Sequence, residues 1–219
     1  MARIASLPLV AGLERVANVE PGFLATFADV VERLGWSQDH ADMLASLISH
    51  ESGFRPDALD PMTKKHVGLM QFGPEFRSKL GLSVQDVLGM SATDQLELVE
   101  AYFQPIRHIA ARDIAMAGLG WGIGKPDDVI VWSEDGTSGV RDEVQPKGYE
   151  QNPGLDVNKD GLITLGEIRD DVARPLRKAQ GRIPIVGGST PSTSQKSSSE
   201  GLMLLGLGAA LLFVLGRKK

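Results

Sequence analysis

Residues 37–54 read SQDHADMLASLISHESGF, and the spacing of apolar residues in this stretch decides the fold class that the sequence predicts. Ser37 is a typical N-cap residue, and Gly53 is a typical residue just beyond a helix end. The apolar residues between them recur every three to four positions, so they would share one face of a helix. The sequence therefore predicts a helix from Ser37 to about Glu51, with an inward face formed by Leu44, Leu47 and Ile48.

The same helical spacing returns in four other stretches of the chain. We expect helices over residues 22–34, from Ser91 or Thr93 to about residue 103, after Pro105, and from about Leu165 onward. Residues 118–148 are rich in glycine, aspartate and proline and show no helical pattern. Because no run of alternating apolar residues indicates strands, the predicted fold class is mainly α.

The C-terminal part of the chain has a different composition. Residues 187–200 contain no apolar residue to bury, which is typical of a flexible linker. The uncharged, mostly apolar stretch that follows would span roughly 24 Å as a helix, and membrane thinning with snorkelling of the terminal cations would match it to a ~30 Å hydrocarbon core. The predicted organisation is an N-terminal segment (1–20), a helical domain (21–183), a linker (184–200), a transmembrane anchor (201–216) and a basic tail (217–219) on the cytoplasmic or equivalent side.

The composition excludes several classes of function. The chain of 219 residues has no cysteine, so disulfides, zinc–thiolate sites and cysteine nucleophiles are impossible. A net charge of -5 argues against a nucleic-acid partner, which requires a clustered basic face. The N-terminus lacks the basic start and long apolar run of a secretory signal. Phe54 stands where a His-Glu-x-x-His zinc motif would place its second histidine.

Glu51 is the candidate general acid. It lies three residues after Ile48 and four after Leu47, so it shares the inward face of the predicted helix. Partial burial and the negative end of the helix dipole both disfavour the carboxylate and raise the pKa of this group. A carboxylic acid that keeps its proton near neutral pH can protonate a glycosidic oxygen. A solvated glutamate at a helix end is the alternative that this geometry leaves open.

Two segments of the chain together resemble a known enzyme family. Residues 48–54 read ISHESGF, and residues 68–72 read GLMQF. They resemble the two signature segments of lysozyme-like lytic transglycosylases, a family related to goose-type lysozyme, and the chain is similar to its phage virion-associated members. In that family the glutamate of the first segment is the sole catalytic carboxyl, and the second segment lines the sugar groove. The resemblance implies a lysozyme-like helical domain that acts on peptidoglycan.

The resemblance also implies a reaction. Glu51 would protonate the oxygen between N-acetylmuramic acid and N-acetylglucosamine, and would then act as a base on the muramyl 6-hydroxyl to give a 1,6-anhydro product. The substrate acetamide would stabilise the positive centre, so no second carboxylate is required. Ser52 would orient Glu51 or the acetamide, and Met70 and Gln71 would contact sugar. A helix-end role for Ser52 and a core role for Met70 are equally open.

A third family motif, Ala-Tyr-Asn, is absent from this sequence. Many members of the family place its tyrosine close to the catalytic carboxyl. Tyr102 lies within a predicted helix and could be a packing residue, and Ala115 stands where related phage sequences carry a tyrosine. Tyr149 is therefore the possible substitute, and we expect it to contact substrate.

Residues 156–167 read DVNKDGLITLGE and match the twelve-residue EF-hand loop. We expect one structural Ca²⁺ here, and no metal for catalysis. An Asp/Asn turn without metal and Mg²⁺ occupancy are the alternatives. No entering helix and no second EF-hand are predicted, which indicates a brace rather than a sensor. The expected ligands are Asp156, Asn158, Asp160, the Leu162 carbonyl, Thr164 and Glu167.

The predicted function is a membrane-anchored peptidoglycan lytic transglycosylase, with a lysozyme-like hydrolase as its variant. Its partners would be glycan strands and, through the C-terminal helix, a lipid membrane. The missing signal peptide favours a phage virion membrane and a role in entry through the cell wall, and a bacterial cell envelope is the rival location. The second function class is a non-catalytic, calcium-braced glycan-binding or virion structural protein.

Overall fold

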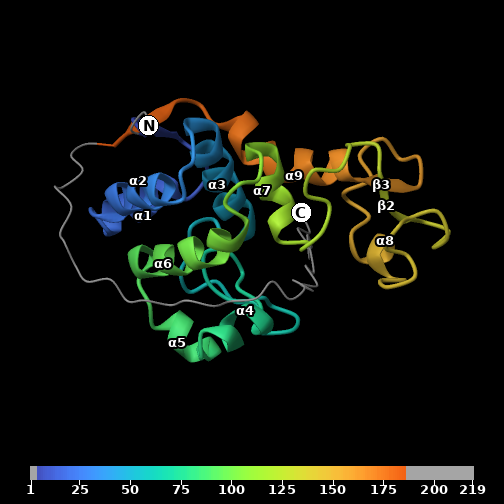
Figure 1. The fold of residues 1–219 in the computed structure, drawn as a ribbon, viewed down its shortest axis with the longest axis horizontal. Coiled ribbons are helices and arrows are strands. Elements are labelled where there is room, and N and C mark those ends of the chain that lie inside the picture. Colours follow the sequence, from blue (N-terminus) through green and yellow to red (C-terminus); the bar gives the residue numbers. More distant parts are fainter. Residues whose placement is uncertain (1–3, 186–219) are drawn as a thin grey trace.

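The structure, a computed structural model, describes residues 4–185 of the chain (Figure 1). The predicted anchor (201–216), the basic tail (217–219) and nearly all of the predicted linker lie outside the described residues. Among residues 4–185, no helix is long and apolar enough to cross a membrane.

Helices dominate the described residues, which confirms the predicted mainly α class. The strands are short, and they form two separate two-stranded antiparallel sheets. In chain order the elements are β1 (Ser6–Pro8), α1 (Leu13–Val19), α2 (Phe23–Arg33), α3 (Gln38–Glu51), α4 (Pro74–Lys79), α5 (Val84–Leu88), α6 (Ala92–Phe103), η1 (Gln104–Ile106), η2 (Ala111–Asp113), α7 (Ile114–Ala117), β2 (Ile130–Ser133), α8 (Gly148–Gln151), β3 (Leu162–Thr164), α9 (Leu165–Lys178) and β4 (Arg182–Pro184).

Four predicted helices are confirmed, namely those that became α2, α3, α6 and α9. Ser37 caps α3, and its side chain and backbone exchange hydrogen bonds with His40 in a capping box. Ser91 caps α6 in the same way through Asp94. Each helix therefore begins where its N-cap residue predicts.

The predicted continuous helix after Pro105 is wrong. The chain instead forms the 3-10 turns η1 and η2 and then the single-turn helix α7. Ala110 is extended between them, and this breaks the helical path. Ile114 is fully buried whereas Ile106 and Ile109 are partly buried at the edge of the core, so these isoleucines reach the core from separate turns rather than from one helical face.

The first sheet joins the two ends of the described chain. Ser6 of β1 pairs with Pro184 of β4 in antiparallel register. The N-terminal segment also contributes Leu7, Val10 and Leu13 to the hydrophobic core, so it packs with the helical domain. The second sheet pairs β2 with β3 and lies with α8 at one end of the molecule, connected to the helices through α9 (Figure 1).

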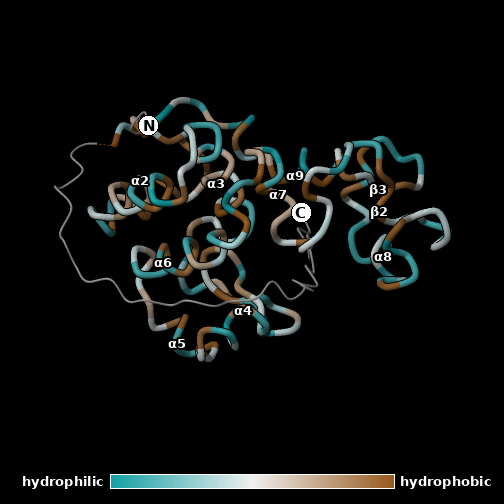
Figure 2. The backbone as a smooth tube through the Cα atoms, in the orientation of Figure 1, coloured by the Kyte–Doolittle hydropathy of each residue, from teal (hydrophilic) through white to brown (hydrophobic). Residues whose placement is uncertain are grey.

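Helix α3 is central to the packing. It lies against α9 more extensively than against any other element, and it also contacts α2, α7 and β1. Hydrophobic and hydrophilic residues alternate along the helices, as amphipathic helices around a shared core require (Figure 2). Phe23 of α2 meets Phe54, just beyond α3, edge to face with ring centroids 5.8 Å apart. The core therefore holds the far end of the turn that follows Glu51, at Phe54.

Helix α9 is held on α3 at a break in its own hydrogen bonding. Pro175 lies inside α9 and lacks a backbone N–H. The buried Ser46 side chain of α3 accepts a 3.1 Å hydrogen bond from the Leu176 N–H and donates a 2.7 Å bond to the Val172 carbonyl. One serine therefore joins the turn of α9 that contains Pro175 to α3 and sets the position of this helix relative to α3.

Candidate active site

Glu51 is the last residue of α3. The residue keeps a partly exposed surface although protein atoms crowd its carboxyl group. Burial and, to a smaller extent, the negative charge of Asp171 together raise the pKa of Glu51 to about 8. A carboxyl group that is protonated at neutral pH can donate a proton to a bound ligand, which is the property that the sequence predicts.

The backbone turns sharply after Glu51. Gly53 and Phe54 both have positive φ angles, of 60° and 58°. A positive φ is unusual for a bulky residue such as Phe54, and its buried ring secures this conformation in the core. The Ser52 hydroxyl donates a 3.2 Å bond to the Ile48 carbonyl, so in this structure Ser52 closes the helix end.

The N-terminal segment packs against the same turn and forms hydrogen bonds with it. Arg15 donates hydrogen bonds to the carbonyls of Gly53 at 2.9 Å and Phe54 at 3.3 Å. Gly12 has a φ of 91°, and a Cβ atom at this position would lie only 2.0 Å from the Gly53 oxygen. The close approach is possible only for glycine, so residues 12 and 15 both hold the backbone beside Glu51.

The second signature segment, residues 68–72, forms a tight turn that is closed by an isolated β-bridge between Val67 and Phe72. Val67 also makes a β-bridge with Leu59. Gln71 has a φ of 49° and donates its side-chain amide to the carbonyls of Ala58 and Gly68. Met70 is 7% exposed and belongs to the hydrophobic core. The structure thus gives Gln71 and Met70 structural contacts, and their contact with sugar stays a prediction.

Gln95 of α6 joins the two signature regions, and sequence reasoning missed it. Its fully buried side chain donates a 2.8 Å bond to the Pro56 carbonyl and accepts a 2.8 Å bond from the Leu69 N–H. Gly68, with a φ of 80°, leaves the space that the Gln95 side-chain oxygen fills, because a Cβ there would lie 2.4 Å from it. Gln95 stands four residues before the buried Val99, and a polar residue on an inward face is the signal that could have found it.

Tyr102, rather than Tyr149, lies near Glu51. Burial and the nearby charge of Glu51 raise the pKa of Tyr102 to about 12, and its hydroxyl donates a 2.9 Å bond to the Ala117 carbonyl. Tyr149 of α8 donates a 2.8 Å bond to Asp156, at the far end of the molecule from α3 (Figure 1). The structure therefore does not bring Tyr149 to Glu51, because α8 belongs to the β2–β3 end of the fold.

A second carboxylate lies beside the α3 end. Asp171 of α9 is 2% exposed, and its carboxylate lies 3.5 Å from His50 Nε2 and forms an ion pair with Arg174. Burial lowers the pKa of His50, the charge of Asp171 opposes this shift, and Arg174 lowers the pKa further. Sequence reasoning missed Asp171 because more than a hundred residues separate it from Glu51.

The candidate calcium loop is closed by its own hydrogen bonds. Asp156 accepts bonds from the N–H groups of Asp160 at 3.2 Å and Gly161 at 3.0 Å, while Glu167 of α9 accepts one from Val157 at 3.1 Å. The first and last acidic residues of the loop are therefore close together. Over residues 4–185, however, no group of three or more His, Asp and Glu side chains is arranged to hold a metal ion.

The remaining predicted ligands also form hydrogen bonds within the loop. Asn158 and Asp160 face each other with a 2.9 Å hydrogen bond, and Asp160 accepts the Leu162 N–H at 2.9 Å. Thr164 caps α9, since its hydroxyl accepts the Glu167 N–H at 3.2 Å. The donor set contains only oxygen atoms, which is the chemistry that Ca²⁺ prefers.

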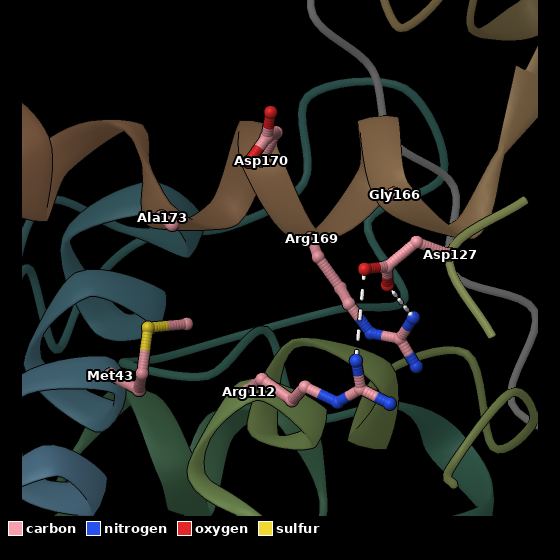
Figure 3. A pocket seen from close by; sticks show the side chains of 7 residues that line it. All are labelled: Met43, Arg112, Asp127, Gly166, Arg169, Asp170 and Ala173. Atoms are coloured by element: carbon pink, nitrogen blue, oxygen red, sulfur yellow. Dashed lines mark hydrogen bonds and ion pairs between the residues drawn. The ribbon is translucent and has the colours of Figure 1, made fainter. Parts of the chain in front are cut away.

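A cavity of about 440 Å³ lies along a different part of α9 (Figure 3). Arg169 points from α9 toward Asp127 and Arg112, whereas Asp170 points away from them (Figure 3). Arg169 also bonds to Asp113 at 2.8 Å. This cavity does not include Glu51, and its buried arginine connects α9 to η2 and to the loop before β2. Its lining residues are Met43, Arg112, Asp127, Gly166, Arg169, Asp170 and Ala173.

Comparison with known proteins identifies one matching family. No curated protein and no solved structure matches the chain. Residues 35–107, about a third of the chain, match the family model described as the transglycosylase SLT domain. This segment contains Glu51, residues 68–72, Gln95 and Tyr102, whereas the candidate calcium loop and Asp171 lie beyond it. The match supports a lytic transglycosylase that acts on peptidoglycan as the general class to which this segment is similar.

Proposed function

We propose that this protein is a peptidoglycan lytic transglycosylase that cleaves the β-1,4 bond between N-acetylmuramic acid and N-acetylglucosamine with Glu51 as its catalytic acid. One observation carries the proposal. Glu51 has a pKa of about 8, ends α3 with an accessible surface, and lies within the segment that matches the transglycosylase family. Most carboxylic acids are ionised at neutral pH, whereas this one retains the proton that glycosidic cleavage requires.

The reaction uses this single carboxyl group twice, first as an acid and then as a base. Glu51 donates it to the glycosidic oxygen as the C1–O bond breaks, and the substrate acetamide stabilises the positive charge that develops at C1. The ionised Glu51 then removes a proton from the muramyl 6-hydroxyl, whose oxygen bonds to C1. Glu51 is protonated again at the end, and the product carries a 1,6-anhydro ring. Tyr102 provides a neutral polar neighbour, because a phenol with a pKa of about 12 does not ionise in this range.

The test compares wild type with Glu51→Gln on purified peptidoglycan. The matched control is Glu32→Gln, which makes the same chemical change at an exposed position of α2. We expect wild type and the control to release soluble fragments and Glu51→Gln to release none. Mass analysis should find anhydro ends, 18 Da lighter than hydrolytic ends by the loss of one water, a difference that follows from the balanced reaction above.

Each other outcome overturns a specific part of the proposal. Equal release by Glu51→Gln would refute Glu51 as the acid. Reducing ends without anhydro rings would indicate a muramidase. Binding of peptidoglycan without release by wild type would favour the second candidate function, a glycan-binding protein, for which the absent Ala-Tyr-Asn motif is the supporting observation.

We propose also that residues 156–167 bind one structural Ca²⁺. The proximity of Asp156 and Glu167 supports this proposal, since an ion held between them would connect the loop to the first turn of α9. Asp156, Asn158, Asp160, the Leu162 carbonyl, Thr164 and Glu167 would provide the ligands. We expect Ca²⁺ to raise the melting temperature of wild type and to leave Glu167→Gln unchanged. An equal midpoint in Ca²⁺ and in chelator for wild type would refute the site.

We propose finally that residues 201–216 anchor the domain to a lipid membrane, which in a phage would be the virion membrane. The support is the uncharged apolar sequence before the basic tail. The full-length chain should float with liposomes in a density gradient, and the double variant Leu205→Asp, Leu212→Asp should remain at the bottom. Flotation of both proteins would show that another surface binds the lipid.

A further inference from the structure

The cavity along α9 is lined by side chains of both charges, and the proposed reaction uses none of them. Its volume of about 440 Å³ lies within the range of ~300–1,000 Å³ that is typical of sites for small molecules. Arg112 comes from η2, Asp127 from the loop before β2 and Arg169 from α9 (Figure 3). Met43 of α3 and Ala173 of α9 add an apolar wall. All of these except Met43 lie beyond the segment that matches the transglycosylase family.

Arg169 is the fixed cation of the cavity. The residue is 6% exposed, and its guanidinium forms ion pairs with Asp113 at 2.8 Å and with Asp127. It also donates hydrogen bonds to the carbonyls of Gly122 at 3.1 Å and Lys125 at 3.0 Å. A buried charge needs a buried partner, and Asp113 is only 3% exposed. The pair with Asp113 and the two carbonyls therefore hold Arg169 in place whether or not Asp127 stays bound to it.

Arg112 is the cation that a ligand can use. Its side chain is 53% exposed, and among residues 4–185 its single ion-pair partner is Asp127, at 3.7 Å. This distance is too long for a hydrogen bond. A guanidinium presents several N–H donors in one plane, which matches the two oxygens of a carboxylate. Arg112 therefore has donors to offer to an anion that enters the cavity.

The carboxylates near the two arginines decide which ligand the cavity accepts. Asp127 lies between Arg112 and Arg169, and its side chain is 59% exposed, so it can turn into water when another anion takes its place (Figure 3). Asp170 points away from the arginines and forms a 3.0 Å ion pair with Arg177. The other charged residues of η2 and of this loop do not line the cavity, namely Asp113, Lys125 and Asp128. The cavity thus presents two cations, one displaceable carboxylate and an apolar wall.

We propose that this cavity binds the free carboxyl end of a peptide that is attached to peptidoglycan. The ligand carboxylate takes the place of Asp127 between Arg112 and Arg169, and the side chain of the last ligand residue lies against Met43 and Ala173. The carboxylate site itself rests on the cavity alone. The assignment to peptidoglycan rests on the proposed function, because that substrate brings peptide ends to the protein.

The position of Met43 in the cavity wall provides a direct measurement of binding. With ¹³C-labelled methionine methyl groups, the Met43 signal can be identified by its loss in Met43→Leu and followed by NMR. The probe is N-acetyl-D-alanyl-D-alanine, which has a free carboxylate and the D configuration of peptidoglycan peptide ends, and the control ligand is its C-terminal amide. We expect the probe to shift the Met43 signal to saturation and the amide to leave it unmoved. The signal of Met70, which belongs to the core, should stay in place with both.

Two variants of opposite effect test the charges. Arg112→Gln removes the available cation and should weaken probe binding about 10- to 100-fold, the usual effect of losing a hydrogen bond to a charged group. Asp127→Asn removes the competing carboxylate and should strengthen binding. Both side chains are more than half exposed, so both variants should fold, and an unmoved Met70 signal checks this. The matched control is Arg55→Gln, because the Arg55 side chain is 58% exposed and lies 3.9 Å from an aspartate outside the cavity.

Several results would overturn the inference. An unmoved Met43 signal, or equal shifts with the acid and the amide, would refute a carboxylate site. Equal binding by wild type and Arg112→Gln would do the same, and so would weaker binding by Asp127→Asn, since a cavity for cations depends on that carboxylate. Binding of N-acetyl-L-alanyl-L-alanine as tight as that of the D form would refute the assignment to peptidoglycan and indicate the C-terminus of a protein.

This inference and the proposed function fail in distinguishable ways. Binding of the probe by a protein that releases no fragments from peptidoglycan would refute the proposed function and leave the carboxylate site intact. Release of fragments by wild type without any shift of Met43 by the probe would refute the carboxylate site alone.

Discussion

Replacing Glu51 with glutamine should stabilise the folded protein at neutral and alkaline pH, even though it should abolish the proposed reaction. The carboxyl has an ordinary pKa of 4.5 and a pKa of about 8 in the folded protein. Between these values the unfolded chain releases the proton and the folded chain keeps it. The contribution of Glu51 to the stability of wild type therefore falls as pH rises above 4.5, and its loss is complete above about pH 8. The glutamine amide has no such titration.

The size of the effect follows from this difference in pKa. At 1.36 kcal/mol for each tenfold change in proton affinity, the difference corresponds to at most about 5 kcal/mol above pH 8 and about 3 kcal/mol at pH 7. Glu51 keeps a partly exposed surface, so solvent reduces these values, and we expect a gain of about 2–4 kcal/mol at pH 8. At pH 5 the gain should be below about 1 kcal/mol.

Urea unfolding of wild type, Glu51→Gln and the control Glu32→Gln at pH 5, 7 and 8 measures this directly. The difference between Glu51→Gln and wild type cancels the titration of groups that both proteins share. We expect it to grow with pH, whereas the control should follow wild type throughout. A Glu51→Gln difference that stays within about 0.5 kcal/mol from pH 5 to pH 8, the range of an ordinary surface substitution, would refute the raised pKa.

Three further predictions concern the contacts that hold the site. Ser46→Ala should lower the free energy of unfolding by about 1–3 kcal/mol, because it removes two hydrogen bonds that join α3 to the main chain of α9. Gly68→Ala should cost about 1–3 kcal/mol more than Gly81→Ala, since both glycines have positive φ but only the first would place a Cβ against Gln95. Tyr102→Phe should cost about 1 kcal/mol through its lost hydrogen bond. Urea unfolding at pH 6 measures all of these.

Each of these has its own control and its own contrary result. Ser49→Ala removes an exposed bond from the same helix, and a loss as large as that of Ser46→Ala would contradict the bridging role of Ser46. Equal losses for the two glycine variants would mean that only the positive φ matters. An unchanged stability of Tyr102→Phe would show that the hydroxyl bonds equally well to water.

The helices could be predicted where a cap and a repeating apolar face coincide, as in α3 and α6. The 3-10 turns after Pro105 could not, because three isoleucines at helical spacing satisfy the same pattern while they reach the core from separate turns. The strands are three or four residues long, too short to show an alternating pattern, and β1 pairs with a partner some 180 residues away. Such a pairing depends on the whole fold rather than on local spacing.

The candidate site likewise contains residues that could be predicted from the sequence and residues that could not. Position on the inward face of α3 made Glu51 a candidate, and the resemblance of residues 48–54 and 68–72 to the two signature segments selected it from the sequence, since these features are local. Tyr102 and Tyr149 could not be distinguished from sequence, because their distances from Glu51 depend on where α6 and α8 pack. Asp171 and Gln95 were missed for the same reason, because their contacts with His50 and Pro56 join segments that are far apart in the sequence.

The sequence by itself determined a mainly helical domain, and its local patterns predicted a proton-donating carboxyl and a loop with oxygen ligands in a fixed order, because each depends on residues within about a dozen positions of one another. Only the tertiary structure decided which groups surround that carboxyl. The packing of α9 on α3 places Asp171 beside His50 at the end of α3, and the packing of α6 places Tyr102 near Glu51. Electrostatic effects on a proton fall off with distance in space, and spatial distance is what folding sets.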